Sequence, residues 1–116
     1  MKDVNCIFCK IVAGEIPGEI VFKDERAVAF KDIHPLAPVH LLIVPRAHVA
    51  SLAAARPEEM PLVGHLVHLA AQLAVKEGIA DRGYRVVINS GPEGDQAVPH
   101  LHVHLLGGRH LSGQLG

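Results

Sequence analysis

Apolar and polar residues alternate near the end of the chain, where His100-Leu101-His102-Val103-His104-Leu105-Leu106 carries a histidine at every second position. Successive side chains of a β-strand point to opposite faces, so this spacing predicts a strand over 100–106. Its three histidines then form one row and its apolar residues face a core, whereas a helix would scatter them around its axis. The segment therefore predicts a strand and a chemically distinctive face together.

The remaining pattern predicts four more strands and two helices. Residues 19–23 and 27–31 read as a hairpin with a charged tip, 39–44 as an apolar central strand, and 84–89 as a further strand. Helical periodicity runs from about residue 57 to 77, with Gly78 as its C-cap, and 6–13 reads as a short helix closed by Gly14. We therefore expect one α+β domain over 1–116, an antiparallel sheet of five strands with one long and one or more short helices, followed by a tail at 107–116.

Composition narrows the functional class. The chain has 116 residues, no Trp, one Tyr and three Phe, so its core is expected to be aliphatic. A formal net charge of −1 supplies no field that would attract nucleic acid or an anionic membrane. The first residues lack the apolar run of a signal peptide, and nothing approaches a membrane span, so we expect a cytoplasmic protein.

Histidine and cysteine are the residues with candidate chemistry. A row of imidazoles suits nucleophilic or acid–base catalysis, suits metal binding through neighbouring rings, or is simply the polar outer face of a sheet. Cys6 and Cys9 form a Cys-x2-Cys pair, which in a reducing compartment favours a metal or redox role. Two thiolates are half of a tetrahedral zinc site, and on chemistry alone the nine histidines all remain possible partners.

Taken together, these motifs resemble those of the histidine triad (HIT) superfamily of nucleotide hydrolases and transferases, in particular its Hint-like branch of purine nucleoside phosphoramidases. The resemblance rests on the alternating histidines and on stretches along nearly the whole chain: Cys-Ile-Phe-Cys-Lys-Ile, Ile16-Pro17, residues 29–33, residues 37–45, the loop at Asn89 and Gly107-Gly108-Arg109. It implies a five-stranded antiparallel sheet per subunit that continues as a ten-stranded sheet across a homodimer.

The resemblance also implies a reaction and roles for individual residues. His102 corresponds to a nucleophile that attacks the α-phosphorus of a purine nucleoside 5′-phosphoramidate, of the AMP-amine or AMP-lysine type, or of a related AMP or GMP conjugate. Water then releases the nucleoside monophosphate from the nucleotidyl-histidine. His104 and Asn89 correspond to donors to the phosphoryl oxygens, and His40 to a support for their hydrogen bonds.

Substrate-binding residues follow from the same resemblance. Asp32 corresponds to the carboxylate that accepts the two ribose hydroxyls, and Gln96 to a contact of the leaving group. An apolar slot for the base is expected from Ile7, Phe8, Ile16, Phe30 and Ile33, each of which is equally compatible with an ordinary core position. Relatives of bacterial type pair the two cysteines with histidines that correspond to His48 and His100, which implies a closed, structural zinc site and no organic cofactor.

Several positions depart from the phosphoramidase pattern. Ala97 stands in the phosphate-binding stretch where a Ser or Thr hydroxyl is usual, and Asp95 where a Gly is usual. His34 replaces a small polar residue, and Gly113 a tryptophan of the tail. We expect a slower or differently selective enzyme. Two alternatives stay open, a dinucleoside polyphosphate hydrolase and a nucleotide-binding or scaffolding dimer with residual activity.

Overall fold

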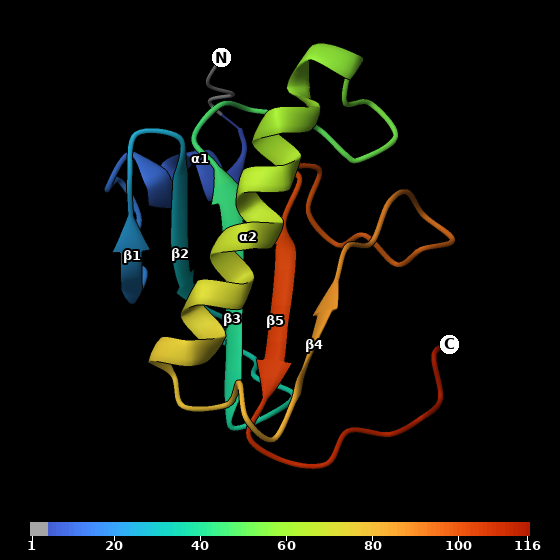
Figure 1. Ribbon diagram of the computed structural model, residues 1–116. Helices are drawn as coiled ribbons and strands as arrows, with labels where there is room; N and C mark the ends of the chain where they lie inside the picture. The colour runs from blue at the N-terminus through green and yellow to red at the C-terminus, as the bar shows by residue number, and fades with distance from the viewer. Residues whose placement is uncertain (1–4) are drawn as a thin grey trace.

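The computed structural model describes residues 5–116, which form a five-stranded antiparallel sheet with strand order β1-β2-β3-β5-β4 (Figure 1). The predicted α+β fold with such a sheet is confirmed. Its strands are β1 (Ile20–Lys23), β2 (Ala27–Lys31), β3 (Val39–Pro45), β4 (Tyr84–Val87) and β5 (Val103–Gly107). β3 lies at the centre, as its apolar sequence predicts, and β1 and β4 are the two edges of the sheet.

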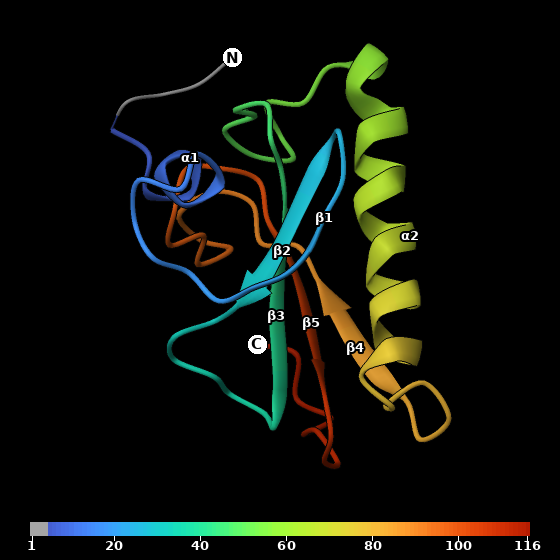
Figure 2. The ribbon, with the colours of Figure 1, turned by 90° about the vertical axis from the view of Figure 1, so that its left-hand side faces the viewer.

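The two α-helices lie on opposite faces of the sheet (Figure 2). Helix α2 (Met60–Lys76) packs on one face, where Leu41 and Ile43 of β3 join Val103 and Leu105 of β5 in a buried aliphatic core. The alternate residues of the same strands point to the other face, which carries the short helix α1 (Ile7–Val12) and a second, smaller core. This second face also carries His40, His102 and His104.

The long helix begins later than its sequence period suggests. Pro57–Glu59 form a 3-10 turn, η1, and α2 follows at once with Pro61 in its first turn, where a missing N–H costs nothing. Gly78 ends the helix at φ +76°, as expected of a C-cap glycine. Within residues 5–116, no helix is both long enough and apolar enough to cross a bilayer.

The predicted histidine strand is shorter than 100–106, because its ladder to β3 begins only at Val103, opposite Ile43. Continuing it would require a bond from Pro45, which has no N–H. Instead, the backbone N–H of Leu101 donates to the carbonyl oxygen of Val49 at 2.7 Å. Leu101 still faces the α2 core, so the alternation of side chains persists outside the strand. As a result, His100 and His102 lie in the segment that leads into β5.

Candidate active site and metal centre

A pocket of about 390 Å³ opens on the face of the sheet opposite α2. His40 comes from β3, His104 from β5, and His102 from the segment just before β5. The other predicted site residues in its wall are Ile7, Phe8, Phe30, Asp32, Ile33 and Ala97. Sequence positions from 7 to 104 therefore meet in one cavity, and most of its wall is apolar.

His102 has one defined tautomer. Its Nδ1 lies 2.7 Å from the carbonyl oxygen of His100. A carbonyl oxygen only accepts, so Nδ1–H is the donor, and in the neutral ring Nε2 keeps its lone pair. The ring of Phe8 packs edge-on against it, with centroids 5.1 Å apart. His102 is only 5% exposed, yet it lines the pocket, so its ring is largely desolvated at the pocket wall.

A chain of hydrogen bonds determines the tautomer of His104 in the same way. The backbone N–H of Leu36 donates to Nδ1 of His40 at 3.1 Å, so neutral His40 carries its proton on Nε2. That Nε2–H faces Nδ1 of His104 at 3.0 Å and Oδ2 of Asp32 at 3.4 Å. His104 therefore accepts at Nδ1 and carries its own proton on Nε2. Neighbouring rings thus differ: His102 offers a lone pair at Nε2 and His104 offers a proton there.

Burial keeps both supporting histidines neutral. Desolvation lowers the pKa of His104 to about 4, with repulsion from His102 and His40 acting in the same direction. Desolvation also lowers the pKa of His40, although the Asp32 carboxylate opposes the shift. Asp32, His40 and His104 offer ligand atoms within 4.8 Å of one another. Because the His40 Nε2–H lies between the other two, we interpret the group as a hydrogen-bonded chain.

These lowered pKa values predict a loss of stability in acid. The unfolded chain titrates His104 near 6.5 and the folded chain near 4, so the unfolded state binds more protons in between. The contribution is complete above pH 6.5 and is lost as the pH falls toward 4. The free energy of unfolding of both proteins should fall between pH 7.5 and pH 5. In His104→Asn, which keeps an acceptor for His40, we expect that fall to be about 1–2 kcal/mol smaller than in the parent, after allowance for partial exposure. Urea denaturation at both pH values measures the difference, and equal losses would contradict it.

Asp32 is positioned by its own loop. Its Oδ1 accepts the backbone N–H of His34 at 2.8 Å, and its backbone N–H donates to the carbonyl oxygen of His40. The side chain is half-buried in the pocket wall beside Ile33, which is largely exposed. The carboxylate is thus held at the pocket, where it can accept hydrogen bonds from a ligand.

Three of the predicted catalytic and substrate-binding residues lie outside this pocket. The amide of Asn89 donates to the backbone carbonyl of Asp95 at 3.4 Å, and Asn89 lines an adjacent pocket of about 280 Å³ that shares His40 and His104 with the first. Gln96 accepts from the N–H of Gly91 and donates to the carbonyl oxygens of Ala50 and Val98, so its amide holds loops together. Ile16 packs on the core under α1.

The structure also shows where the residues that depart from the phosphoramidase pattern lie. Ala97 and His34 lie in the pocket wall, where a hydroxyl and a small side chain were expected. Asp95 is exposed, is not part of that wall, and adopts φ +60°, a left-handed conformation that explains why glycine suits this position. The wall also contains residues that the sequence analysis did not single out, notably Ile11, Leu36, Leu42 and Val98. An apolar side chain by itself carries no signal that distinguishes a pocket wall from an ordinary core position.

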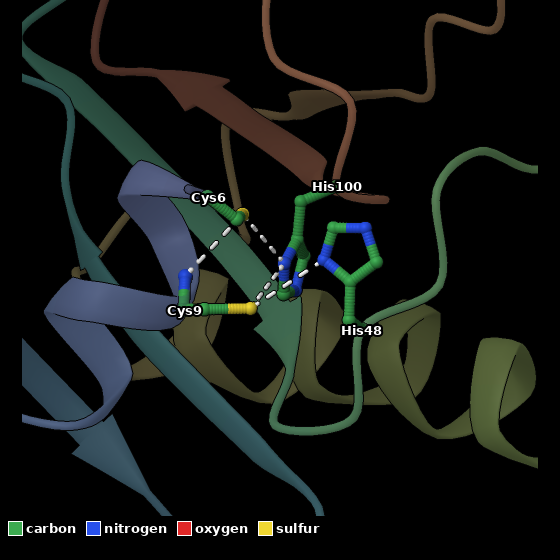
Figure 3. A group of neighbouring side chains, drawn as sticks. All are labelled: Cys6, Cys9, His48 and His100. Atoms are coloured by element: carbon green, nitrogen blue, oxygen red, sulfur yellow. Dashed lines mark hydrogen bonds between the residues drawn. The ribbon is translucent and has the colours of Figure 1, made fainter. Parts of the chain in front are cut away.

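A second cluster lies beside the pocket, where four side chains from three parts of the chain point toward one another (Figure 3). Cys6 and Cys9 come from the start of α1, His48 follows β3, and His100 precedes β5. Each offers a ligand atom within 4.8 Å of the others, and all but His48 are buried. Nδ1 of His100 is 3.2 Å from Sγ of Cys6 and 3.5 Å from Sγ of Cys9, and Nδ1 of His48 is 3.4 Å from Sγ of Cys9.

The protonation of this cluster suits a cation. Nε2 of His100 lies 2.9 Å from the carbonyl oxygen of Pro45, so it carries the proton, and Nδ1 offers a lone pair to the two sulfurs. A tetrahedral Zn²⁺ with usual bond lengths holds N and S ligands roughly 3.5 Å apart, close to the separations found here. Burial raises the pKa of the Cys6 thiol, and a bound cation is what would favour its thiolate. The donor set therefore fits a closed zinc site.

Comparisons with known proteins agree with this fold. The family model "Scavenger mRNA decapping enzyme C-term binding" matches residues 5–116. A HIT-like protein of Synechococcus elongatus is 49% identical over 108 residues, 93% of this chain and 94% of that protein. A 14 kDa zinc-binding protein of Zea mays is 46% identical over 114 residues (97% and 88%), and Adenylylsulfatase HINT1 of Arabidopsis thaliana is 43% identical over 113 residues (96% and 76%).

Solved structures show the same similarity. A HIT family hydrolase from Legionella pneumophila superimposes with a TM-score of 0.94 at 45% identity, covering 97% of this chain and all of that one. A zinc-bound histidine triad family protein from Mycobacterium smegmatis has a TM-score of 0.78 at 29% identity, covering 90% and 76%. The fold and these relatives together define a small α+β hydrolase. The chain belongs to the histidine triad family, and the predicted enzyme class, a hydrolase, is confirmed.

Proposed function

We propose that this protein hydrolyses purine nucleoside 5′-phosphoramidates, of the AMP-amine or AMP-lysine type, to the nucleoside monophosphate and the amine. The observation that carries the proposal is the state of His102. Its Nδ1–H is donated to a backbone carbonyl, so the lone pair of Nε2 is available at the wall of a pocket of about 390 Å³. A positioned neutral imidazole is what nucleophilic attack on phosphorus requires.

The reaction proceeds in two displacements at phosphorus. In the first, Nε2 of His102 forms a bond to the α-phosphorus, the P–N bond to the amine breaks, and the amine departs with one proton taken up from water. In the second, water attacks the nucleotidyl-histidine, the P–Nε2 bond breaks, and a nucleoside monophosphate and a proton are released. The Nε2–H of His104, oriented through His40, donates to the phosphoryl oxygens as charge develops on them.

The substrate's other parts match the remaining wall. We assign Asp32 to the ribose hydroxyls and the apolar side chains of Ile7, Phe8, Phe30 and Ile33 to the purine ring. Asn89 lines the adjoining pocket, which also contains His104. We assign Asn89 to contact with the substrate's phosphate group. Ile16 and Gln96 act indirectly in this proposal, Ile16 through packing under α1 and Gln96 by holding the loop that carries Ala97.

We also infer the assembly and the cellular setting. β4 is an edge strand of the sheet, and its pairing with a second copy would give a homodimer with a continuous ten-stranded sheet. The net charge of −1 supports a small-molecule substrate over nucleic acid or membrane, and the reduced cysteine pair supports a cytoplasmic location.

A structural zinc ion is the cofactor that the second cluster supports. Cys6, Cys9, His48 and His100 would hold it, and the zinc-binding relative of maize has a related sequence. When bound, zinc supplies a crosslink and no chemistry at the substrate, because all four of its ligands come from the protein. The crosslink joins α1, the loop after β3 and the segment before β5.

A panel of adenylyl conjugates tests the proposed reaction. We expect turnover of adenosine 5′-phosphoramidate and an adenylyl-lysine conjugate, with AMP as product. The similarity to an adenylylsulfatase makes adenylyl sulfate the second substrate to measure, and diadenosine tetraphosphate represents the dinucleoside polyphosphate alternative. Faster cleavage of either would replace the P–N assignment. AMP binding without turnover of any conjugate would favour the scaffolding alternative.

Ala97 predicts a specific deficit in rate. A hydroxyl at this point of the pocket wall would donate to the phosphate or to the departing amine, and loss of one such donor typically costs about 2.7–4 kcal/mol. We therefore expect Ala97→Ser to raise kcat by about ten- to a hundredfold, less than the full value because the neighbouring donors remain. Ala97→Val, which adds no donor, is the matched control. An unchanged kcat in Ala97→Ser would contradict this prediction and would show that another group already donates a hydrogen bond to the phosphate.

A further inference from the structure

His100 takes part in both the metal centre and the active site. Its ring is fixed at both nitrogens: Nε2–H donates to Pro45, and Nδ1 faces the sulfurs of Cys6 and Cys9. Its backbone carbonyl accepts the Nδ1–H of His102 at 2.7 Å. One residue therefore presents its side chain to the four-residue cluster and its main chain to the nucleophile. No other hydrogen bond from the protein holds Nδ1 of His102, among the contacts described for residues 5–116.

Phe8 provides a second connection. It belongs to α1 and lies between Cys6 and Cys9 in the sequence. Its ring packs edge-on against the rings of His100 and His102, with centroids 5.9 Å and 5.1 Å away. Helix α1 has only six residues, too few to be stable by itself, so its position depends on its contacts with the sheet. Within the helix, the backbone N–H of Cys9 donates to Sγ of Cys6 at 3.4 Å.

We propose that the Cys6–Cys9–His48–His100 cluster is a positioning device for the nucleophile, so that its occupancy by zinc determines how strictly the His102 ring keeps its lone pair on Nε2. The inference rests on the proposed function for the role of His102. With the cluster closed, His100 is held at its ring, its carbonyl points at Nδ1–H, and Phe8 bounds the ring on one side. With the cluster open, the His100 segment and α1 relax, and His102 samples its other tautomer, whose Nε2 is protonated and cannot attack.

The tautomer of His102 is measured directly by 15N–1H correlation of the imidazole nitrogens in the zinc-loaded protein, with the His102→Asn spectrum as the assignment. We expect a single Nδ1–H form. Removal of zinc with dipicolinate, or His48→Ala, should give averaged Nδ1 and Nε2 shifts. If the substrate is a phosphoramidate, kcat should fall about tenfold, the value of one ordinary hydrogen bond, with a smaller change in KM. One equivalent of zinc should restore both readouts in the chelated parent.

A general loss of stability is separated from this effect by Leu73→Ala, which opens a cavity in the α2 core on the other face of the sheet. That variant should keep the single Nδ1–H form. The proposal is overturned by a parent that takes up no added zinc, by a His102 tautomer that does not respond to zinc removal, or by the same averaging in Leu73→Ala. Since the spectra need no substrate, an enzyme that turns over none of the conjugates leaves this test intact and contradicts only the proposed function.

Discussion

His102→Asn is expected to lower kcat for adenosine 5′-phosphoramidate by about 10⁴-fold or more, because it removes the atom that we propose forms the covalent bond to phosphorus. Asparagine is a conservative choice at this position. Its side-chain amide has a donor near the place of Nδ1 and can still bond to the carbonyl oxygen of His100, which lies 2.7 Å from Nδ1 in the parent. The fold and the pocket should therefore survive while the nucleophile is lost.

Two measurements accompany the rate. Titration with AMP should give a Kd within a fewfold of the parent's, because Asp32 and the apolar wall are unchanged. Rapid quench of the parent with substrate in alkaline denaturant, which preserves the acid-labile P–N bond, followed by mass spectrometry at neutral to alkaline pH, should show the added mass of one adenylyl group on the peptide that contains residue 102. His104→Asn is the comparison variant, which should slow turnover and still form the adduct. A His102→Asn protein that turns over substrate within a hundredfold of the parent, or an adduct on another residue, would contradict the assignment.

Loss of the proposed zinc site is expected to have the largest effect on stability. Cys9→Ser should abolish stoichiometric zinc and lower the free energy of unfolding by about 3–5 kcal/mol, because folding energy is coupled to binding at a site formed only in the native state. Cys9 is 1% exposed and contacts both histidines of the cluster, so serine leaves buried groups without their partner. Elemental analysis and urea denaturation, each with and without dipicolinate, measure the two effects.

Ile11→Val is the matched control for that experiment. Ile11 is buried in the same helix and the same small core as Cys9, and its loss of one methylene should cost about 0.5–1.5 kcal/mol without loss of zinc. The chelator should destabilise the parent and Ile11→Val equally and leave Cys9→Ser unchanged. A parent protein without zinc after expression in zinc-supplemented medium, or a Cys9→Ser variant as stable as the parent, would contradict the prediction.

The sequence predicted a helix or strand correctly where the spacing of apolar side chains and the turn residues suffice to specify it. The apolar run at 39–44 is a central strand because both of its faces are covered, and Gly78 closes α2 because it accommodates a left-handed φ. The extent of the histidine strand was wrong at its start. A ladder needs a donor on the partner strand, and the partner there is Pro45, which is far away in sequence.

The sequence likewise indicated some residues of the candidate site and not others. His102, His104, His40 and Asp32 meet in one pocket, as the resemblance implies, and their type and spacing are visible in the chain. The pocket's other walls are not, because Leu36 and Leu42 have the same apolar character as residues of the core. Gln96 is a polar residue whose position the sequence could not predict. Its side-chain amide bonds to loop backbones, because the fold places Ala50 and Gly91 beside it.

By itself the sequence determined which segments are strands and helices, the alternation that separates an aliphatic core from a histidine face, and the presence of two thiols and nine imidazoles. Only the tertiary structure decided which nitrogen of each ring carries the proton. His100 and His102 are two residues apart with the same chemistry, yet Nδ1 accepts in one and donates in the other. The physical reason is that a neutral imidazole has one proton, and its position is determined by the acceptor that the fold places beside the ring, the Pro45 carbonyl for His100 and the His100 carbonyl for His102.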